Sequence, residues 1–157
     1  MRNLKIIFIL FVVNQCYSQT NIEQKSFDYF FTEIIKKEFP DAKKIKFSGY
    51  TEKQFQRISS FLGNCLSKDE ISRYLKDDEN SNQDKLKITD NYSKNVRFTN
   101  GKRPIVLSLY LSKKINLGDR NLVCIEVVKK NSFGVIYFFL YDNIGNLNSW
   151  CKISFMI

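Results

Sequence analysis

The N-terminal third of the chain carries apolar residues at helical spacing. They recur three and four positions apart, with charged residues between them. This period is typical of an amphipathic helix that buries one face. Pro40 cannot continue a helix, so we expect the helix to cover residues 22–39. Its predicted core face consists of Phe27, Phe30, Phe31, Ile34 and Ile35.

Two further helices are predicted before residue 80. Thr51 has Gln54 three residues later, and Ser67 has Glu70 at the same spacing. At this spacing the two side chains cap each other's backbone amides at a helix start. The apolar faces of these two helices are Phe55, Ile58, Leu62, Cys65 and Leu66 in one, and Ile71, Tyr74 and Leu75 in the other.

The second half of the chain changes to the alternating or continuous apolar pattern of β-strands. The strand candidates are residues 104–112, 121–129, 133–141 and 147–156, with weaker ones at 44–48 and 96–99. Three residues separate 121–129 from 133–141, and the stretch DNIGN follows the latter. Such short connections join only antiparallel neighbours.

Side-chain parity predicts how these elements pack. Leu107, Leu109 and Leu111 share one face of their strand, whereas residues 133–141 are apolar on both faces and are expected to be central. The predicted fold class is α+β, with the N-terminal helices packed on one face of a four- to six-stranded antiparallel meander sheet.

The first residues have the order of a secretory signal peptide. Arg2 and Lys5 precede eight consecutive apolar residues, and small or polar residues follow up to Ser18. Eight residues are too few to span a bilayer. We expect residues 1–18 to be cleaved and residues 19–157 to form a single globular α+β domain, periplasmic or extracellular in a bacterium. Lipidation at Cys16 is disfavoured, because Val-Asn-Gln precedes it instead of a leucine and two small residues.

The formal charge of +9 points to anionic partners, and lysines far outnumber arginines. Nucleic acid is disfavoured as a partner, because proteins that recognise bases and phosphates favour arginine, whose guanidinium donates paired hydrogen bonds. A solvated surface of a lysine-rich chain is the alternative interpretation. The basic residues near strand ends form a predicted rim that comprises Lys102, Arg103, Lys113, Lys114, Lys129 and Lys130.

The chain contains no histidine. Ser-His and Cys-His nucleophilic sites and histidine zinc sites are therefore excluded. No CxxC or phosphate-binding glycine motif is present, so no cofactor is expected. Asp77, Asp78 and Glu79 offer carboxylates for a small hydrolase of envelope polysaccharide, which is the alternative function, although a polar loop also explains them.

Three cysteines follow the predicted signal peptide. Cys65 and Cys151 occupy core-facing positions of their elements, so any disulfide is expected to join these two. Buried free thiols are the alternative. Cys124 shares parity with Glu126 and is expected to point away from the core, unless the outer face of the sheet is also covered.

The aromatic residues of the strands suggest a binding surface. We expect a non-enzymatic binding or interaction domain whose aromatic outer sheet face meets the basic rim, with an envelope protein or a small apolar or anionic ligand as partner. A second packing layer or a homodimer interface explains the same aromatic residues. The predicted aromatic set is Tyr110, Tyr137, Phe139, Tyr141 and Trp150.

Overall fold

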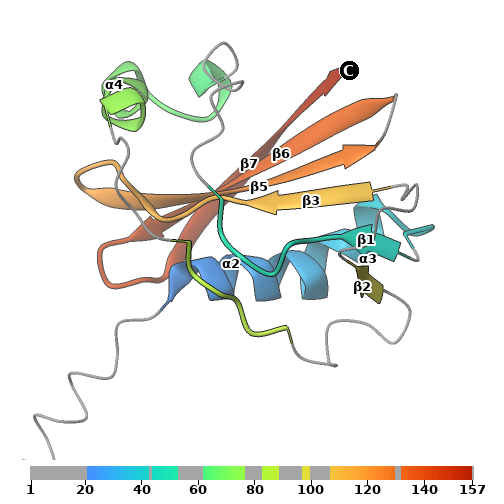
Figure 1. Cartoon of the computed structure of the whole chain (residues 1–157). Coiled ribbons are helices and arrows are strands. Elements are labelled where there is room, and N and C mark those ends of the chain that lie inside the picture. Colours follow the sequence, from blue (N-terminus) through green and yellow to red (C-terminus); the bar gives the residue numbers. More distant parts are fainter. Residues whose placement is uncertain are drawn as a thin grey trace, which may run out of the picture.

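A central sheet lies between two helical layers (Figure 1). The computed structural model describes residues 21–42, 44–52, 62–76, 83–88, 97–99, 107–129 and 132–156, with only the backbone of 97–99. The predicted signal peptide, the loop at 77–82 and most of the second predicted helix lie outside these ranges.

The first layer is one continuous helical segment. It consists of α2 (Ile22–Tyr29), a π-helical turn η1 (Phe30–Ile34) and α3 (Ile35–Glu38). The side chain of Asn21 accepts a hydrogen bond from the Gln24 amide at 2.8 Å and begins the helix. All five predicted core residues are buried, so the helix and its inward face are confirmed.

The second layer is the sheet, whose strands follow one another in the spatial order β2-β1-β3-β5-β6-β7, with β4 paired to β5. The pairs β3–β5, β5–β6 and β6–β7 are all antiparallel, which confirms the antiparallel arrangement predicted for the second half of the chain. The strand bounds are β1 (Lys44–Lys46), β2 (Arg97–Thr99), β3 (Leu107–Leu111), β4 (Ile115–Asn116), β5 (Arg120–Lys129), β6 (Phe133–Asp142) and β7 (Leu147–Met156).

The prediction of a purely antiparallel meander is wrong at one end of the sheet. There, β1 runs parallel to both β2 and β3, so the sheet is mixed. Parallel neighbours require a long crossover connection. The chain between β1 and β2 supplies that connection and contains α4 (Lys68–Lys76), which lies on the far side of the sheet from α2 (Figure 1).

The prediction that all helices pack on one face is also corrected. The face covered by α2, η1 and α3, here called the helix face, holds Val123, Tyr137 and Phe139. The opposite face holds Leu122, Cys124 and Phe138, and it is covered by residues 62–76, here called the cap. The cap consists of a 3-10 turn η3 (Leu62–Asn64) and α4.

Cys124 lies on the sheet face opposite Val123 and Ile125, as its parity predicts, and it is buried because the cap also covers that face. The cap makes a second core there, which is the exception that the prediction allowed. The central position of β6 is confirmed, because its residues 134–141 are buried on both faces.

Gly134 on β6 lies directly beneath the Phe155 ring of β7, and a Cβ atom built at position 134 overlaps that ring. We expect Gly134→Ala to lower the free energy of unfolding by about 1–3 kcal/mol, because added volume displaces a packed ring. Urea unfolding measures the change. Gly63→Ala is the matched control, since no atom lies within 4 Å of its added Cβ. Equal stability of the two variants contradicts the close packing at Gly134.

Candidate functional site

Three of the predicted surface rings lie inside the helix face. The Phe30 ring packs 5.2 Å from the Tyr137 ring, and Tyr29 packs 6.0 Å from Phe139. The Tyr141 hydroxyl and Ser26 share a buried hydrogen bond of 2.8 Å. The prediction that these rings form an outer binding face is therefore wrong. They do share one face, but it is the one that the first helix covers.

Tyr110 and Trp150 lie on opposite faces of the sheet. Tyr110 pairs with Glu126 on the cap face and is half-buried, whereas Trp150 pairs with Phe139 on the helix face. Trp150 stands at the sheet edge, 37% exposed, with its ring 6.1 Å from the Tyr137 ring. The two rings therefore cannot belong to a single aromatic surface.

Tyr137 carries an uncommon buried hydroxyl. Among the described residues, none gives this oxygen a hydrogen-bond partner, although it is inaccessible to solvent. Burial raises the pKa of Tyr137, and the negative charge of Glu38 raises it further. The phenol is therefore neutral at physiological pH, held between the Phe30 and Trp150 rings.

The predicted basic rim is divided between the two ends of β3. Leu107 pairs with Lys129, so Lys129 lies at the start of β3, whereas Lys113 and Lys114 follow its end. Lys113 follows Leu107 by six residues, so roughly 20 Å of extended chain separates Lys113 from the level of Lys129. The remaining rim residues, Lys102, Arg103 and Lys130, lie outside the described residues, so the described lysines do not form one continuous rim.

Each described rim lysine has a local contact. The Lys113 ammonium lies 3.2 Å from Asp84, and the Lys114 backbone amide donates to Glu23 at 2.8 Å. The Lys129 ammonium lies 5.7 Å from the centre of the Phe133 ring. These contacts place the lysines around the sheet ends rather than around a shared cavity.

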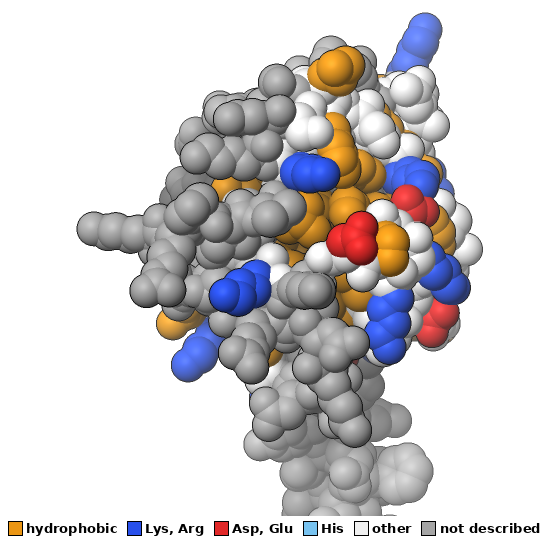
Figure 2. Space-filling model, turned by 90° about the vertical axis from the view of Figure 1, so that its right-hand side faces the viewer, with side chains coloured by type: hydrophobic (Ala, Val, Ile, Leu, Met, Phe, Trp, Pro, Cys, Tyr) orange, Lys and Arg blue, Asp and Glu red, His pale blue; other side chains and the backbone are white. Residues whose placement is uncertain are grey.

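The outer strand β7 offers a different surface. It ends the sheet, and among the described residues no strand pairs with its outer side. Most of its side chains are exposed, and the Lys152 ammonium binds Glu38 of α3 at 2.6 Å. Apolar side chains are visible at the end of the molecule where β7 finishes, bordered by charged side chains (Figure 2).

A disulfide joins the cap to β7. The structure bonds Cys65, next to η3, to Cys151 in the middle of β7, with a Cα–Cα distance of 6.1 Å. That distance lies within the usual range for a disulfide. Both residues are half-buried. Cys124 is a buried free thiol, and burial raises its pKa.

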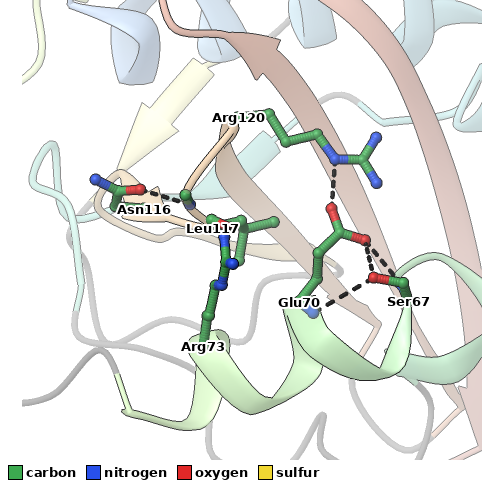
Figure 3. Close-up of polar contacts among 7 residues, drawn as sticks. Ser67, Glu70, Arg73, Asn116, Leu117 and Arg120 are labelled. Atoms are coloured by element: carbon green, nitrogen blue, oxygen red, sulfur yellow. Dashed lines mark hydrogen bonds and ion pairs between the residues drawn. The ribbon is translucent and has the colours of Figure 1, made fainter.

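A polar cluster fastens α4 to the turn before β5 (Figure 3). Glu70 accepts hydrogen bonds from the Ser67 amide and hydroxyl, each at 2.8 Å, and the Ser67 oxygen accepts from the Glu70 amide. This arrangement confirms the capping pattern predicted from Ser67 and Glu70. The other Glu70 oxygen accepts from the Arg120 guanidinium, and Arg73 donates to the Leu117 carbonyl.

The Glu70 carboxyl is strongly acidic as a result. The hydrogen bond from Arg120 lowers the pKa of Glu70 to about 2, and the Ser67 donors add to this effect against the opposing effect of burial. Sequence spacing revealed the Ser67 contact but not Arg120, which lies fifty positions away in the chain.

The carboxylates proposed for hydrolysis, Asp77, Asp78 and Glu79, lie outside the described residues. A different acidic pair emerges from the structure. Burial raises the pKa of Glu52, and the charge of Glu126 raises it further. The backbone of Glu52 forms an isolated parallel β-bridge with Ser112, next to β5. The sequence did not reveal this acidic pair, because residues 52 and 126 are far apart in the chain.

Comparisons with protein-family models, with curated proteins and with solved structures found no match. Within the described ranges, no helix is long and apolar enough to cross a membrane. In the same part of the chain, no group of three or more cysteine or acidic side chains is placed to hold a metal ion.

Glu70→Gln should keep the hydrogen bonds with Ser67 at the start of α4 but remove the negative charge that faces Arg120. We expect a loss of about 2 kcal/mol of unfolding free energy at pH 7, the order of a charged hydrogen bond. Because the pKa of Glu70 is lowered when folded, this contribution is present above the unfolded value near 4.5 and lost as pH falls towards about 2. Urea unfolding across pH 2–7 measures the difference between wild type and variant.

Ser67→Ala is the matched control for this experiment. It removes the Ser67 hydroxyl that bonds to Glu70 and retains the Glu70–Arg120 ion pair. We therefore expect a loss of about 1 kcal/mol of unfolding free energy, with most of its dependence on acid preserved. A difference between wild type and Glu70→Gln that stays constant from pH 7 to pH 2 contradicts the role of the ion pair.

Proposed function

We propose that this chain is a non-enzymatic interaction domain that binds an extended segment of another protein along β7. One observation carries the proposal. A ten-residue strand forms the end of the sheet, and no described strand occupies its outer side. Of the predicted aromatic face, only Trp150 is part of this proposal, because Tyr137, Phe139 and Tyr141 are buried beneath the first helix. The predicted basic rim is not part of it, because its described lysines are divided between the two ends of β3.

The backbone of β7 supplies the chemistry for binding. Every second residue of an edge strand directs its N–H and C=O groups away from the sheet. An incoming extended segment satisfies these groups and lengthens the sheet by one strand. The opposite edge offers much less, because β2 has only three residues.

The side chains of β7 indicate the character of the partner segment. Trp150 is partly exposed and supports an aromatic or aliphatic side chain of the partner. The strand contains no acidic residue, and its one charged side chain, Lys152, is paired with Glu38. Without the predicted signal peptide, which contains Arg2 and Lys5, the formal charge of the chain falls from +9 to +7. An extended segment with apolar and acidic residues therefore matches this edge best. A second copy of the chain is a poorer match, because it brings a like charge.

A synthetic peptide of about ten alternating threonine and valine residues, with two threonines replaced by aspartate, serves as the probe. We expect it to shift the backbone amide resonances of β7 and the indole resonance of Trp150 in two-dimensional NMR spectra. The matched peptide with lysine in place of aspartate should bind more weakly, and the difference should shrink with added salt.

Trp150→Ala should weaken binding by about tenfold, the equivalent of about 1.4 kcal/mol. Ile144→Ala is the control, since Ile144 is exposed in the turn between β6 and β7 but lies outside the strand. Absence of shifts at millimolar peptide, or shifts that avoid β7, would overturn the proposal.

We also infer that the domain acts outside the cytoplasm after removal of residues 1–18. The inference rests on the charged start, the apolar run and the small residues before Gln19. Intact-mass measurement of the exported protein should give a chain that begins at Gln19. A chain that begins at Cys16 and carries added acyl mass contradicts the inference.

A further inference from the structure

We propose that the Cys65–Cys151 disulfide is a redox latch, and that its reduction by a dithiol frees the cap and opens the cap face around Cys124 while the helix face stays folded. This inference does not depend on peptide binding at β7. It follows from the way in which the cap is attached to the sheet.

The cap is anchored at two opposite corners of the surface that it covers. Cys151 pairs with Phe138, which pairs with Cys124, so these residues form one row across three strands. Arg120, the other anchor, lies four residues before Cys124 on β5. The anchors are therefore separated by roughly 10 Å across the strands and roughly 13 Å along them.

The area between the anchors is apolar. Leu122, Cys124, Phe138 and Leu140 are buried there beneath Leu62, Leu66 and Tyr74 of the cap. The cap contributes only these three fully buried apolar side chains, and α4 has nine residues. A helix of this length is marginal without tertiary support. Its attachment to the sheet therefore depends strongly on the two anchors.

The two anchors hold different ends of the cap. The contacts of Glu70 and Arg73 bind α4 to residues 117–120, whereas the disulfide binds the end next to η3. Among the described residues, the buried side chains that still hold that end after reduction are Leu62 and Leu66. The cap can then turn away about the anchor at residues 117–120, which uncovers the row that runs from Cys151 on β7 through Phe138 to Cys124 on β5.

The helix face does not share this dependence. Its core residues, including Phe27, Phe31 and Tyr137, form a cluster separate from that of the cap face. The sheet lies between α2 and α4, which belong to the two different covers (Figure 1). Loss of the cap is therefore expected to be a local opening rather than global unfolding.

The redox step is an ordinary thiol–disulfide exchange. A thiolate of the dithiol attacks one sulfur of the half-buried Cys65–Cys151 bond, and its second thiol resolves the mixed disulfide. This chain gains two electrons and two protons as two thiols, and the reductant becomes a disulfide. Cys124 takes no part in the exchange. Because its thiol is buried, it reports whether the cap is open.

The test compares oxidised and dithiothreitol-reduced protein by alkylation and by hydrogen–deuterium exchange, both read by mass spectrometry. In unfolded, unreduced protein, only Cys124 among Cys65, Cys124 and Cys151 should be alkylated. In folded protein, reduction should accelerate alkylation of Cys124 at least about tenfold. Deuterium uptake should rise in residues 62–76 but not in residues 22–38.

The double variant Cys65→Ser with Cys151→Ser should reproduce the reduced behaviour without any reductant. Cys124→Ser keeps the disulfide and should keep residues 62–76 protected. Three outcomes overturn the latch: alkylation of Cys65 and Cys151 in unfolded, unreduced protein; unchanged protection of Cys124 after reduction; and simultaneous loss of protection in residues 22–38 and 62–76, which shows that the bond stabilises the whole fold instead.

Discussion

Strand β6 imposes the main physical constraint on this fold. Its residues 134–141 are buried on both sides, and the aromatic and aliphatic side chains on each side must be removed from water. Burial of a large apolar side chain contributes about 1.5–3 kcal/mol, so neither face can be left exposed without a large loss of stability. A single helical layer covers only one face. The two-layer arrangement of first helix and cap follows from this requirement.

The two layers differ in how they are held. The first helix packs a continuous apolar stripe on the helix face, and the Ser26–Tyr141 and Glu38–Lys152 contacts add to that packing. The cap is short and mostly polar on its outer side, so it is attached by specific bonds: the disulfide at one corner and the Glu70–Arg120 pair at the other. The cover of the cap face therefore depends more on specific bonds, and the cover of the helix face more on apolar packing. The cap face is the one whose cover responds to redox state and to strong acid.

The ends of the sheet differ as well. At one end β1 and β2 are three residues each and run parallel, which leaves little edge for another chain. At the other end β7 is ten residues long and mostly exposed. Natural proteins protect long edges with charges placed within the strand. Here Lys152 is the single charge in β7, and it is bound to Glu38. The edge is therefore only partly protected, which is consistent with a role in recognition.

The sequence by itself determined the local elements. The spacing of Phe27, Phe30 and Ile34 indicated the first helix, and alternating or continuous apolar runs indicated β5 to β7. Ser67 with Glu70 marked the start of α4. Each of these features depends on residues that are near neighbours in the chain. Only the tertiary structure decided which face each layer covers, that β1 lies parallel to β3, and that Arg120 meets Glu70. Parity shows which side chains share a face, but it does not show what lies above that face. That depends on where distant segments return, which is set by the burial of both sides of β6 and not by any local pattern.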